Sequence, residues 1–217
     1  MRKPYVIVIG RQFGSGGHEI GEKLAKRLGI PLYDKDILAK IAEEKGIAAD
    51  LLHKMDENLK GNRWFNVGLQ AKGMGVLGSS FLFETDTSAV IDRDKVFTWQ
   101  SQLIRELAEK EDCIIIGRCA DYVLKDHPGL ISIFVTAPLA AREARIEERY
   151  PNHQKDAYET YNEFIRRTDR ARASYYSFHT DRDWGDIGNY HLVVDATRLG
   201  IDGTVNMLED YVKHCAE

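Results

Sequence analysis

The sequence has few cysteines, no long apolar run and no large excess of either charge. Its three cysteines, Cys113, Cys119 and Cys215, are an odd number and lack the spacing of metal ligands. They indicate reduced thiols in a cytosol rather than a disulfide framework. The apolar run after Arg2 and Lys3 is too short for a signal peptide, and no stretch approaches the length of a membrane span. We therefore expect a cytoplasmic protein with no membrane partner.

The charge balance and the histidines exclude two further kinds of site. A formal net charge of −4 gives no general attraction to nucleic acid, so any site for a polyanion must be a local cluster of arginines. The seven histidines form neither an H-x₃-H nor an H-x-x-E-H pair, and we therefore assign no metal site. We expect small-molecule partners and no nucleic acid, and a homo-oligomer stays an open alternative.

Short apolar strands alternate with helical patterns along the chain, without internal repeats. The length of 217 residues and a hydrophobic content of 43% suit one α/β domain with a sizeable insertion, or at most two small domains. We predict strands at 5–9, 30–33, 113–116, 131–135 and 190–195. We predict helices at about 18–28, 36–46, 50–59, 95–111 and 202–214, one opened by Pro138, and a long one through 165–172. This alternation predicts a parallel sheet covered by helices on both faces.

A glycine-rich turn, Gly14-Ser15-Gly16-Gly17, joins the first predicted strand to the first predicted helix. This layout is typical of phosphate sites, because the glycines let backbone N–H groups converge and the helix N-terminus adds partial positive charge. The Walker pattern G-x-x-x-x-G-K-[ST] is incomplete here, since its first glycine falls on Arg11. Its lysine falls on Gly17 and its hydroxyl on His18, so the backbone cradle is present without the lysine and the Mg²⁺-binding hydroxyl.

Other interpretations of the glycines stay open at this point. The dinucleotide fingerprint G-x-G-x-x-G fails because Glu19 stands in place of its last glycine, which makes a dinucleotide-dependent oxidoreductase a weak alternative. Taken alone, the loop could simply join a core strand to a core helix. The glycine-rich segment 61–94 is typical of a binding loop or mobile flap, or of an insertion without a ligand role.

Arginine is concentrated in the second half of the chain. Eight arginines lie between residues 142 and 182: Arg142, Arg145, Arg149, Arg166, Arg167, Arg170, Arg172 and Arg182. Any one of them is more simply part of a solvated helix face. Their placement favours phosphate, since ligands of open α/β sheets bind outside the carboxyl ends of the strands. Arg118 and the glycine loop both lie there, and the planar fork of arginine suits phosphate oxygens.

Two acidic residues, Asp34 and Asp36, follow the second predicted strand. An acidic residue at this point of an α/β sheet often meets a ribose or a substrate. Asp36 taken alone is more simply the N-cap of the helix that follows. Both are therefore candidate ligand contacts with a structural alternative.

Several motifs together resemble the cytidylate kinase-like family, a branch of the P-loop nucleoside monophosphate kinases. They are GRQFGSGGH at 10–18, LYDKD at 32–36, IGRCAD at 116–121, TAP at 136–138, RASYY at 172–176 and WG at 184–185. The resemblance runs nearly end to end and mainly misses the glycine-rich segment. It implies a three-layer P-loop kinase fold with a central parallel sheet of about five strands. In this single domain, 1–217, the core would be 1–35, 95–148 and 186–217, the monophosphate-binding insertion about 36–94, and the helical lid with its flanking helices about 149–185.

The resemblance also implies roles for single residues. It places the ATP phosphates on the glycine loop and the start of the helix, and the ATP base near Thr197. It places the acceptor monophosphate on Arg118, next to Cys119, which replaces the aspartate of the family's Gly-Arg-Asp. The implied nucleotide-binding residues are Gly14, Ser15, Gly16, Gly17, His18, Glu19 and Thr197, and the implied acceptor-binding residues are Asp34, Asp36, Arg118 and Asp121.

Phosphoryl transfer needs aligned reactants and positive charge on the oxygens in flight more than it needs covalent chemistry. We expect arginines to supply the charge that the Walker lysine normally gives. The candidates are Arg11 and the lid arginines Arg166, Arg170 and Arg172. ATP would come with Mg²⁺, held by its phosphates, water and a carboxylate, for which Glu19 and Asp34 are the candidates.

The expected function is ATP-dependent phosphoryl transfer to a nucleoside monophosphate, such as CMP or dCMP, or to a related small phosphorylated acceptor. The alternative is a nucleotide-binding or regulatory module that has lost transfer. The missing lysine and hydroxyl favour this module, whereas the dense arginines and Arg118 favour the kinase, since a sensor has less need of a clamp on the transition state.

Overall fold

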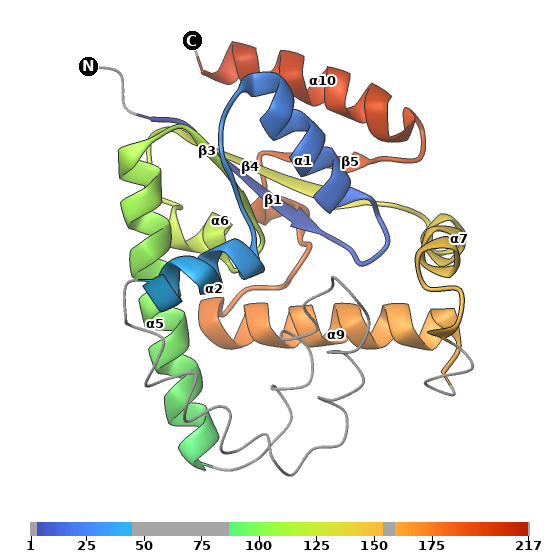
Figure 1. The fold of residues 1–217 in the computed structure, drawn as a ribbon, viewed down its shortest axis with the longest axis horizontal. Helices are drawn as coiled ribbons and strands as arrows, with labels where there is room; N and C mark the ends of the chain where they lie inside the picture. Colours follow the sequence, from blue (N-terminus) through green and yellow to red (C-terminus); the bar gives the residue numbers. More distant parts are fainter. Residues whose placement is uncertain (1–3, 45–86, 154–158, 217) are drawn as a thin grey trace.

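The computed structural model describes residues 4–44, 87–153 and 159–216. Its centre is one sheet of five parallel strands in the order β2-β3-β1-β4-β5 (Figure 1). The strands are β1 (Val6–Arg11), β2 (Leu32–Tyr33), β3 (Cys113–Ile116), β4 (Leu130–Thr136) and β5 (Leu192–Asp195). The predicted parallel sheet is confirmed, with its second strand shorter than predicted.

Helices cover both faces of this sheet (Figure 1). They are α1 (Gly17–Leu28), α2 (Lys35–Glu44), α5 (Thr87–Lys110), α6 (Ala120–Val123), α7 (Leu139–Arg149), α9 (Tyr161–Thr180) and α10 (Gly200–Cys215), with a short 3₁₀ helix η1 (Ile187–Asn189). Helices α1 and α10 pack together on one face, and α5 and α6 cover the other. In the described part of the chain, no helix is long and apolar enough to cross a membrane.

The helix predictions differ from the structure at a few points. Helix α5 begins at Thr87, within the segment that the glycine pattern assigned to an insertion. The short α6 was not predicted, because four residues are too few to show a period. The predicted helix at 50–59 and most of the glycine-rich segment lie outside the described residues.

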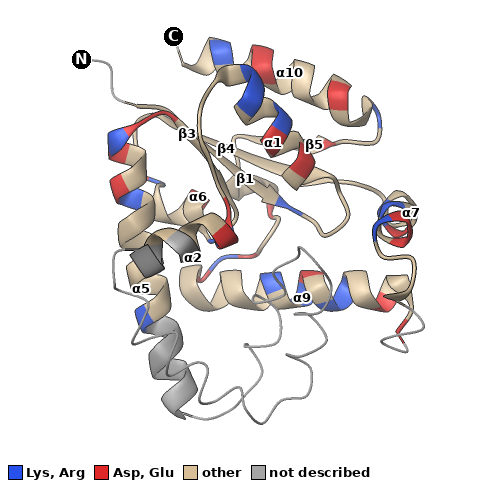
Figure 2. Cartoon of the chain, in the orientation of Figure 1, with Lys and Arg blue, Asp and Glu red and all other residues tan. Residues whose placement is uncertain are grey.

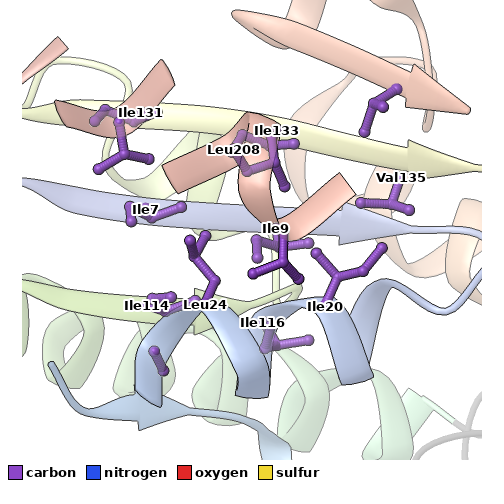
Figure 3. Close-up of a cluster of buried hydrophobic side chains, with 14 of the residues drawn as sticks. Ile7, Ile9, Ile20, Leu24, Ile114, Ile116, Ile131, Ile133, Val135 and Leu208 are labelled. Carbon is purple, nitrogen blue, oxygen red and sulfur yellow. The ribbon is translucent and has the colours of Figure 1, made fainter. Parts of the chain in front are cut away.

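Strand β1 lies in the middle of the sheet and is buried on both faces. Val6, Ile7, Val8 and Ile9 have no exposed surface, as expected for a parallel strand between two layers of helices. Ile7 and Ile9 point toward α1 and α10 (Figure 3), while Val6 and Val8 pack on the α5 side. The continuous apolar run that predicts this strand is therefore the reason for its central place.

Helix α1 is bounded by two glycines in the left-handed region. Gly16 precedes the helix with φ of 87°, and Gly29 follows it with φ of 67° and a backbone N–H that bonds to Ala25 O. The predicted stop at Gly29 is confirmed, and Ile20 and Leu24 are fully buried against the sheet. The glycine loop is therefore fixed between a central strand and a packed helix.

The parallel strands bring their carboxyl ends to one edge of the sheet. In the register of β1 with its neighbours, Ile9 pairs with Ile116 and Arg11 pairs with Val135. The glycine loop that follows β1 and the turn that follows β3 at Gly117 therefore lie next to each other. Helix α9 runs past this edge (Figure 1) and contacts the glycine loop directly.

Candidate functional site

The loop between β1 and α1 turns at two glycines with positive φ. Gly14 has φ of 80° and Gly16 has φ of 87°, conformations that residues with a side chain rarely adopt. Space is short as well, because a Cβ at Gly16 would lie 2.5 Å from Ile201 Cδ1. A Cβ at Gly14 would lie 3.0 Å from Arg142 O. The glycines are therefore required by the shape of the loop, which leads its backbone into the N-terminus of α1, a geometry suited to phosphate.

Two helices hold the outer side of this loop through its backbone. Arg142 Nε of α7 donates to Phe13 O at 2.7 Å, and Arg145 Nη1 donates to Gly14 O at 2.7 Å. From α9, Asp169 Oδ1 accepts from Phe13 N at 2.8 Å, and the same carboxylate pairs with Arg142. Arg142 is buried, so its charge is used to shape the loop rather than offered to solvent.

Gln12 fixes the inner side of the loop to the end of β4. Its backbone N–H donates to Val135 O at 3.0 Å, and its Oε1 accepts from Thr136 Oγ1 at 2.5 Å and from Ala137 N at 3.3 Å. The buried Ser15 donates from Oγ to Gln12 O at 2.9 Å. The loop is thus held in one shape from both sides, which preorganises it for a ligand.

The side chain of Arg11 passes between two glycines that belong to different segments. A Cβ at Gly17 would lie 2.6 Å from Arg11 Cβ and 3.1 Å from Arg11 Cγ. A Cβ at Gly117 would collide with Arg11 Nη1. The guanidinium therefore lies over the turn that follows β3, beside the glycine loop. Figure 2 shows further basic residues on α7 and α9, the helices that hold this loop.

Arg11, Arg118 and Arg172 form a cationic cluster at the carboxyl edge of the sheet. Burial, then the charges of Arg172 and Arg118, lower the pKa of Arg11 well below its ordinary value, and the charge of Asp34 opposes this. Burial and the charge of Arg118 also act on Lys35, whose pKa is lowered. The neighbouring cations thus oppose the charges of Arg11 and Lys35, so a multiply charged anion placed among them would be stabilised.

Arg172 supports this cluster from α9. Its Nη1 donates to Arg11 O at 2.9 Å, and its guanidinium lies 5.4 Å from the centre of the Phe13 ring. Burial lowers the pKa of Arg172 to about 10, with Asp169 acting in the opposite direction. The side chain thus stays charged at neutral pH while it fixes the end of β1.

The turn that carries Arg118 has an unusual backbone. Gly117, Arg118 and Cys119 follow one another with φ of 71°, 60° and 55°. Residues with a side chain rarely take such angles, and they concentrate where a site imposes them. Tyr175 of α9 lies beside Arg118; burial raises the pKa of Tyr175 to about 12, and Arg118 opposes that shift. The strained turn thus places Arg118 beside α9.

The predicted capping role falls on Asp34 and not on Asp36. Helix α2 begins at Lys35, and Asp34 Oδ1 accepts from the backbone N–H groups of Asp36 and Ile37, both at 3.0 Å. Asp34 Oδ2 lies 3.1 Å from His18 Nε2. Burial opposes ionisation, but the hydrogen bonds from Ile37 and His18 prevail and lower the pKa of Asp34. Asp34 is therefore an ionised carboxylate at the edge of the cluster.

The model of the cytidylate kinase-like family matches residues 6–198. The chain belongs to this family. A search of curated proteins gave no match. Membership in the cytidylate kinase-like family supports nucleotide-dependent phosphoryl transfer in general.

Solved structures agree with the fold of the cytidylate kinase-like family. An uncharacterized protein from Eubacterium ventriosum ATCC 27560 is 29% identical, with a TM-score of 0.66 over 98% of this chain and 99% of that chain. A gluconokinase from Sinorhizobium meliloti 1021 is 14% identical, with a TM-score of 0.50 over 100% of this chain and 95% of that chain. A shikimate kinase from Bacteroides thetaiotaomicron is 17% identical, with a TM-score of 0.50 over 96% and 98%. These likenesses confirm the predicted P-loop kinase fold.

The structure brings together only part of the site predicted for this family member. Of the predicted arginines, Arg11 and Arg172 lie in the cationic cluster, together with Arg118. Arg166 and Arg170 are exposed on another face of α9, where Arg166 Nε donates to Asn162 Oδ1 at 2.7 Å. The regular spacing of arginines along the helix did not show which face would meet the loop.

Three further predicted residues lie away from the cluster or are engaged elsewhere. Asp121 of α6 is buried and accepts a hydrogen bond of 2.6 Å from Tyr176 OH. Glu19 is exposed and pairs with Lys23 at 3.2 Å. Thr197 lies in the turn after β5, and its backbone N–H and its hydroxyl both donate to the Asp195 carboxylate.

The residues at the site fit Mg²⁺ that comes with a nucleotide better than a resident ion. In the described part of the chain, no three His, Cys, Asp or Glu side chains form a group that could hold a metal ion. Of the two predicted carboxylates, Asp34 acts through its charge on Arg11, whereas Glu19 pairs with Lys23. Mg²⁺ commonly takes one or two carboxylates and keeps water and phosphate ligands, and Asp34 suits that part.

Sequence reasoning missed the residues that shape the loop. Gln12 and Asp169 carry its hydrogen bonds, and Arg142 is turned inward instead of toward a ligand. A polar residue inside a glycine loop and an acidic residue among the arginines of α9 were the available signals. Neither signal shows which residue is bound, because Gln12 bonds to Thr136 and Asp169 bonds to Phe13, both far away along the chain.

Proposed function

We propose that this protein catalyses ATP-dependent phosphoryl transfer to a nucleoside monophosphate or to a related small phosphorylated acceptor. The observation that carries the proposal is the cluster of Arg11, Arg118 and Arg172 beside the glycine loop. The charges of Arg172 and Arg118 oppose the charge of Arg11, so the cluster suits phosphates that bring several negative charges.

In this proposal the two substrates approach the cluster from different elements. The backbone of the loop from Gly14 to His18 holds the ATP phosphates at the start of α1. Arg118, on the turn after β3, holds the acceptor phosphate. An acceptor oxygen forms a bond to the γ-phosphorus while the bond to the β,γ-bridging oxygen breaks, and ADP leaves with that electron pair.

The Mg²⁺ that accompanies ATP supplies positive charge to the phosphate oxygens. The protein side chains do the orienting: Arg172 fixes the carbonyl of Arg11, and His18 holds Asp34. CMP and dCMP are the first acceptors to test, because the family resemblance points to them.

A non-catalytic nucleotide-binding module is the second candidate. Gly17 and His18 stand where a Walker loop has its lysine and hydroxyl, and this observation favours the module. The two functions differ in one measurable way. A kinase releases ADP only when an acceptor is present, whereas a module binds ATP without turnover.

The experiment is coupled detection of ADP release from ATP·Mg²⁺ across a panel of nucleoside monophosphates, with a reaction that lacks acceptor as control. We expect acceptor-dependent turnover, and we expect Arg118→Ala to lower kcat/KM by about 10²-fold or more. Arg105→Ala is the matched control, because Arg105 is an exposed arginine of α5 outside the cluster. A rise in melting temperature with ATP, without turnover for any acceptor, would support the module instead.

A further inference from the structure

The glycine in place of the Walker lysine has a structural cause. Gly17 is the first residue of α1, and its neighbours leave no room for a side chain. The space is filled by Arg11, whose Cβ and Cγ would lie 2.6 and 3.1 Å from a Cβ at Gly17. Residue 17 is therefore glycine because Arg11 already occupies the place where a lysine side chain would begin.

A second glycine lets the Arg11 side chain reach its end point. Gly117 has φ of 71°, and a Cβ there would collide with Arg11 Nη1. Gly17 and Gly117 together form a passage for the Arg11 side chain between the glycine loop and the turn after β3. The guanidinium at its end lies against Gly117, in the turn that carries Arg118.

The backbone of Arg11 is held by the sheet and by helix α9. Arg11 is the last residue of β1 and pairs with Val135 of β4. Its carbonyl accepts the hydrogen bond of 2.9 Å from Arg172 Nη1. A cation whose backbone is already held loses less conformational freedom when a phosphate binds.

Asp34, the carboxylate whose charge acts on Arg11, directs its two oxygens to other groups. Asp34 uses Oδ1 for the backbone N–H groups of Asp36 and Ile37, and Oδ2 for His18. Arg118 and Arg172 oppose the charge of Arg11, and this repulsion is relieved when a phosphate binds. The site therefore holds a cation that an anion would stabilise.

We propose that Arg11 is the catalytic cation of this loop, and that it takes the part of a Walker lysine from a different position in the chain. Its guanidinium contacts oxygens of the γ-phosphoryl group as that group passes from ATP to the acceptor oxygen, and Arg11 keeps all its protons. Gly17 and Gly117 are required because their missing side chains leave room for the Arg11 side chain. The inference rests on the proposed phosphoryl transfer.

The test moves the cation back to the Walker position. Arg11→Gly empties the passage, because it also removes the Cβ that would lie 2.6 Å from a Cβ at residue 17. Adding Gly17→Lys then places a lysine where the Walker pattern has one. We expect R11G to lower kcat by on the order of 10²-fold or more, and R11G/G17K to recover about tenfold or more over R11G. Arg105→Ala should stay at the wild-type rate, since Arg105 is exposed on α5.

A binding measurement separates this inference from the proposed function. By calorimetry, R11G should lower the affinity for a non-hydrolysable ATP analogue more than it lowers the affinity for ADP, and R11G/G17K should restore the affinity for the analogue. If the wild type shows no turnover with any acceptor, the proposed transfer is wrong, while the difference between the two affinities still tests the role of Arg11. Equal affinities for the analogue in wild type and R11G would overturn the inference.

A second pair of variants tests the proposal even if the double variant fails to fold. Arg11→Lys keeps a charge in the same passage, and Arg11→Gln keeps polar bulk without charge. We expect R11K to retain clearly more turnover and analogue binding than R11Q at similar melting temperatures. Equal losses in R11K and R11Q would show that Arg11 only fills space, and would overturn the proposal.

Discussion

Arg172 Nη1 donates a hydrogen bond of 2.9 Å to the backbone carbonyl of Arg11. The bond joins two residues whose charges repel, since Arg172 lowers the pKa of Arg11. It ties α9 to the end of the central strand, at the point where the glycine loop begins. Helix α9 therefore determines where the loop starts, and not only what covers it.

We expect Arg172→Ala to impair the site more than it impairs the fold. The hydrogen bond to Arg11 O and the contact with the Phe13 ring are lost, and a bond from a charged donor contributes about 1.5–3 kcal/mol. Removal of a cation that repels Arg11 offsets part of this loss in stability. The check is urea unfolding together with KM for ATP; a large loss of stability with an unchanged KM would contradict the expectation.

The ionised Asp34 carboxylate should make stability depend on pH. The pKa of Asp34 is lower in the folded chain than in the unfolded chain, so its contribution is fully present above the unfolded pKa. That contribution is lost as the pH falls through the folded pKa. Asp34→Asn keeps a capping oxygen but no charge, and we expect its deficit in unfolding free energy to shrink between about pH 6 and pH 3. A deficit that is constant across this range would contradict the assignment.

Asp121 and Tyr176 should behave as one buried unit. Burial raises the pKa of Asp121, and the hydrogen bond of 2.6 Å from Tyr176 OH opposes this shift. Tyr176→Phe removes that donor and leaves a buried carboxylate with one partner fewer, which should destabilise the fold by about 1–3 kcal/mol. Adding Asp121→Asn should recover part of the loss. Strictly additive free energies in this double-mutant cycle would show that the two residues do not interact.

The sequence predicts the sheet well because each buried strand carries its own signal. The run from Val6 to Ile9 is apolar throughout, as a strand covered on both faces must be. The site is less predictable, because its contacts join distant segments. Nothing local in Arg11 or Gly117 shows that the guanidinium of one needs the missing Cβ of the other.

The face of a long helix is equally hard to assign from spacing alone. Arg166, Arg170 and Arg172 are similar in the sequence, yet the first two are exposed and the third bonds to the loop. The difference comes from the packing of α9 around the buried Ile165. The same limit applies to Asp34 and Asp36. Whether the first or the second of them caps α2 depends on a shift of two residues in the start of the helix, which the sequence does not show.

Two glycines with similar positive φ allow the passage of Arg11 to be tested without changing Arg11. Gly117 and Gly29 have φ of 71° and 67°, and a Cβ at Gly29 would meet nothing within 4 Å. Either change to alanine imposes the left-handed conformation on a residue with a side chain, which should lower stability by about 1–2 kcal/mol.

Only at Gly117 does the new Cβ also meet a functional group, since it collides with Arg11 Nη1. We therefore expect Gly117→Ala and Gly29→Ala to lose similar unfolding free energy, while kcat falls strongly in Gly117→Ala alone. The measurements are urea unfolding and ADP release for both variants, at a temperature where both are folded. Equal rates in the two variants would mean that the position of the Arg11 guanidinium does not matter for transfer.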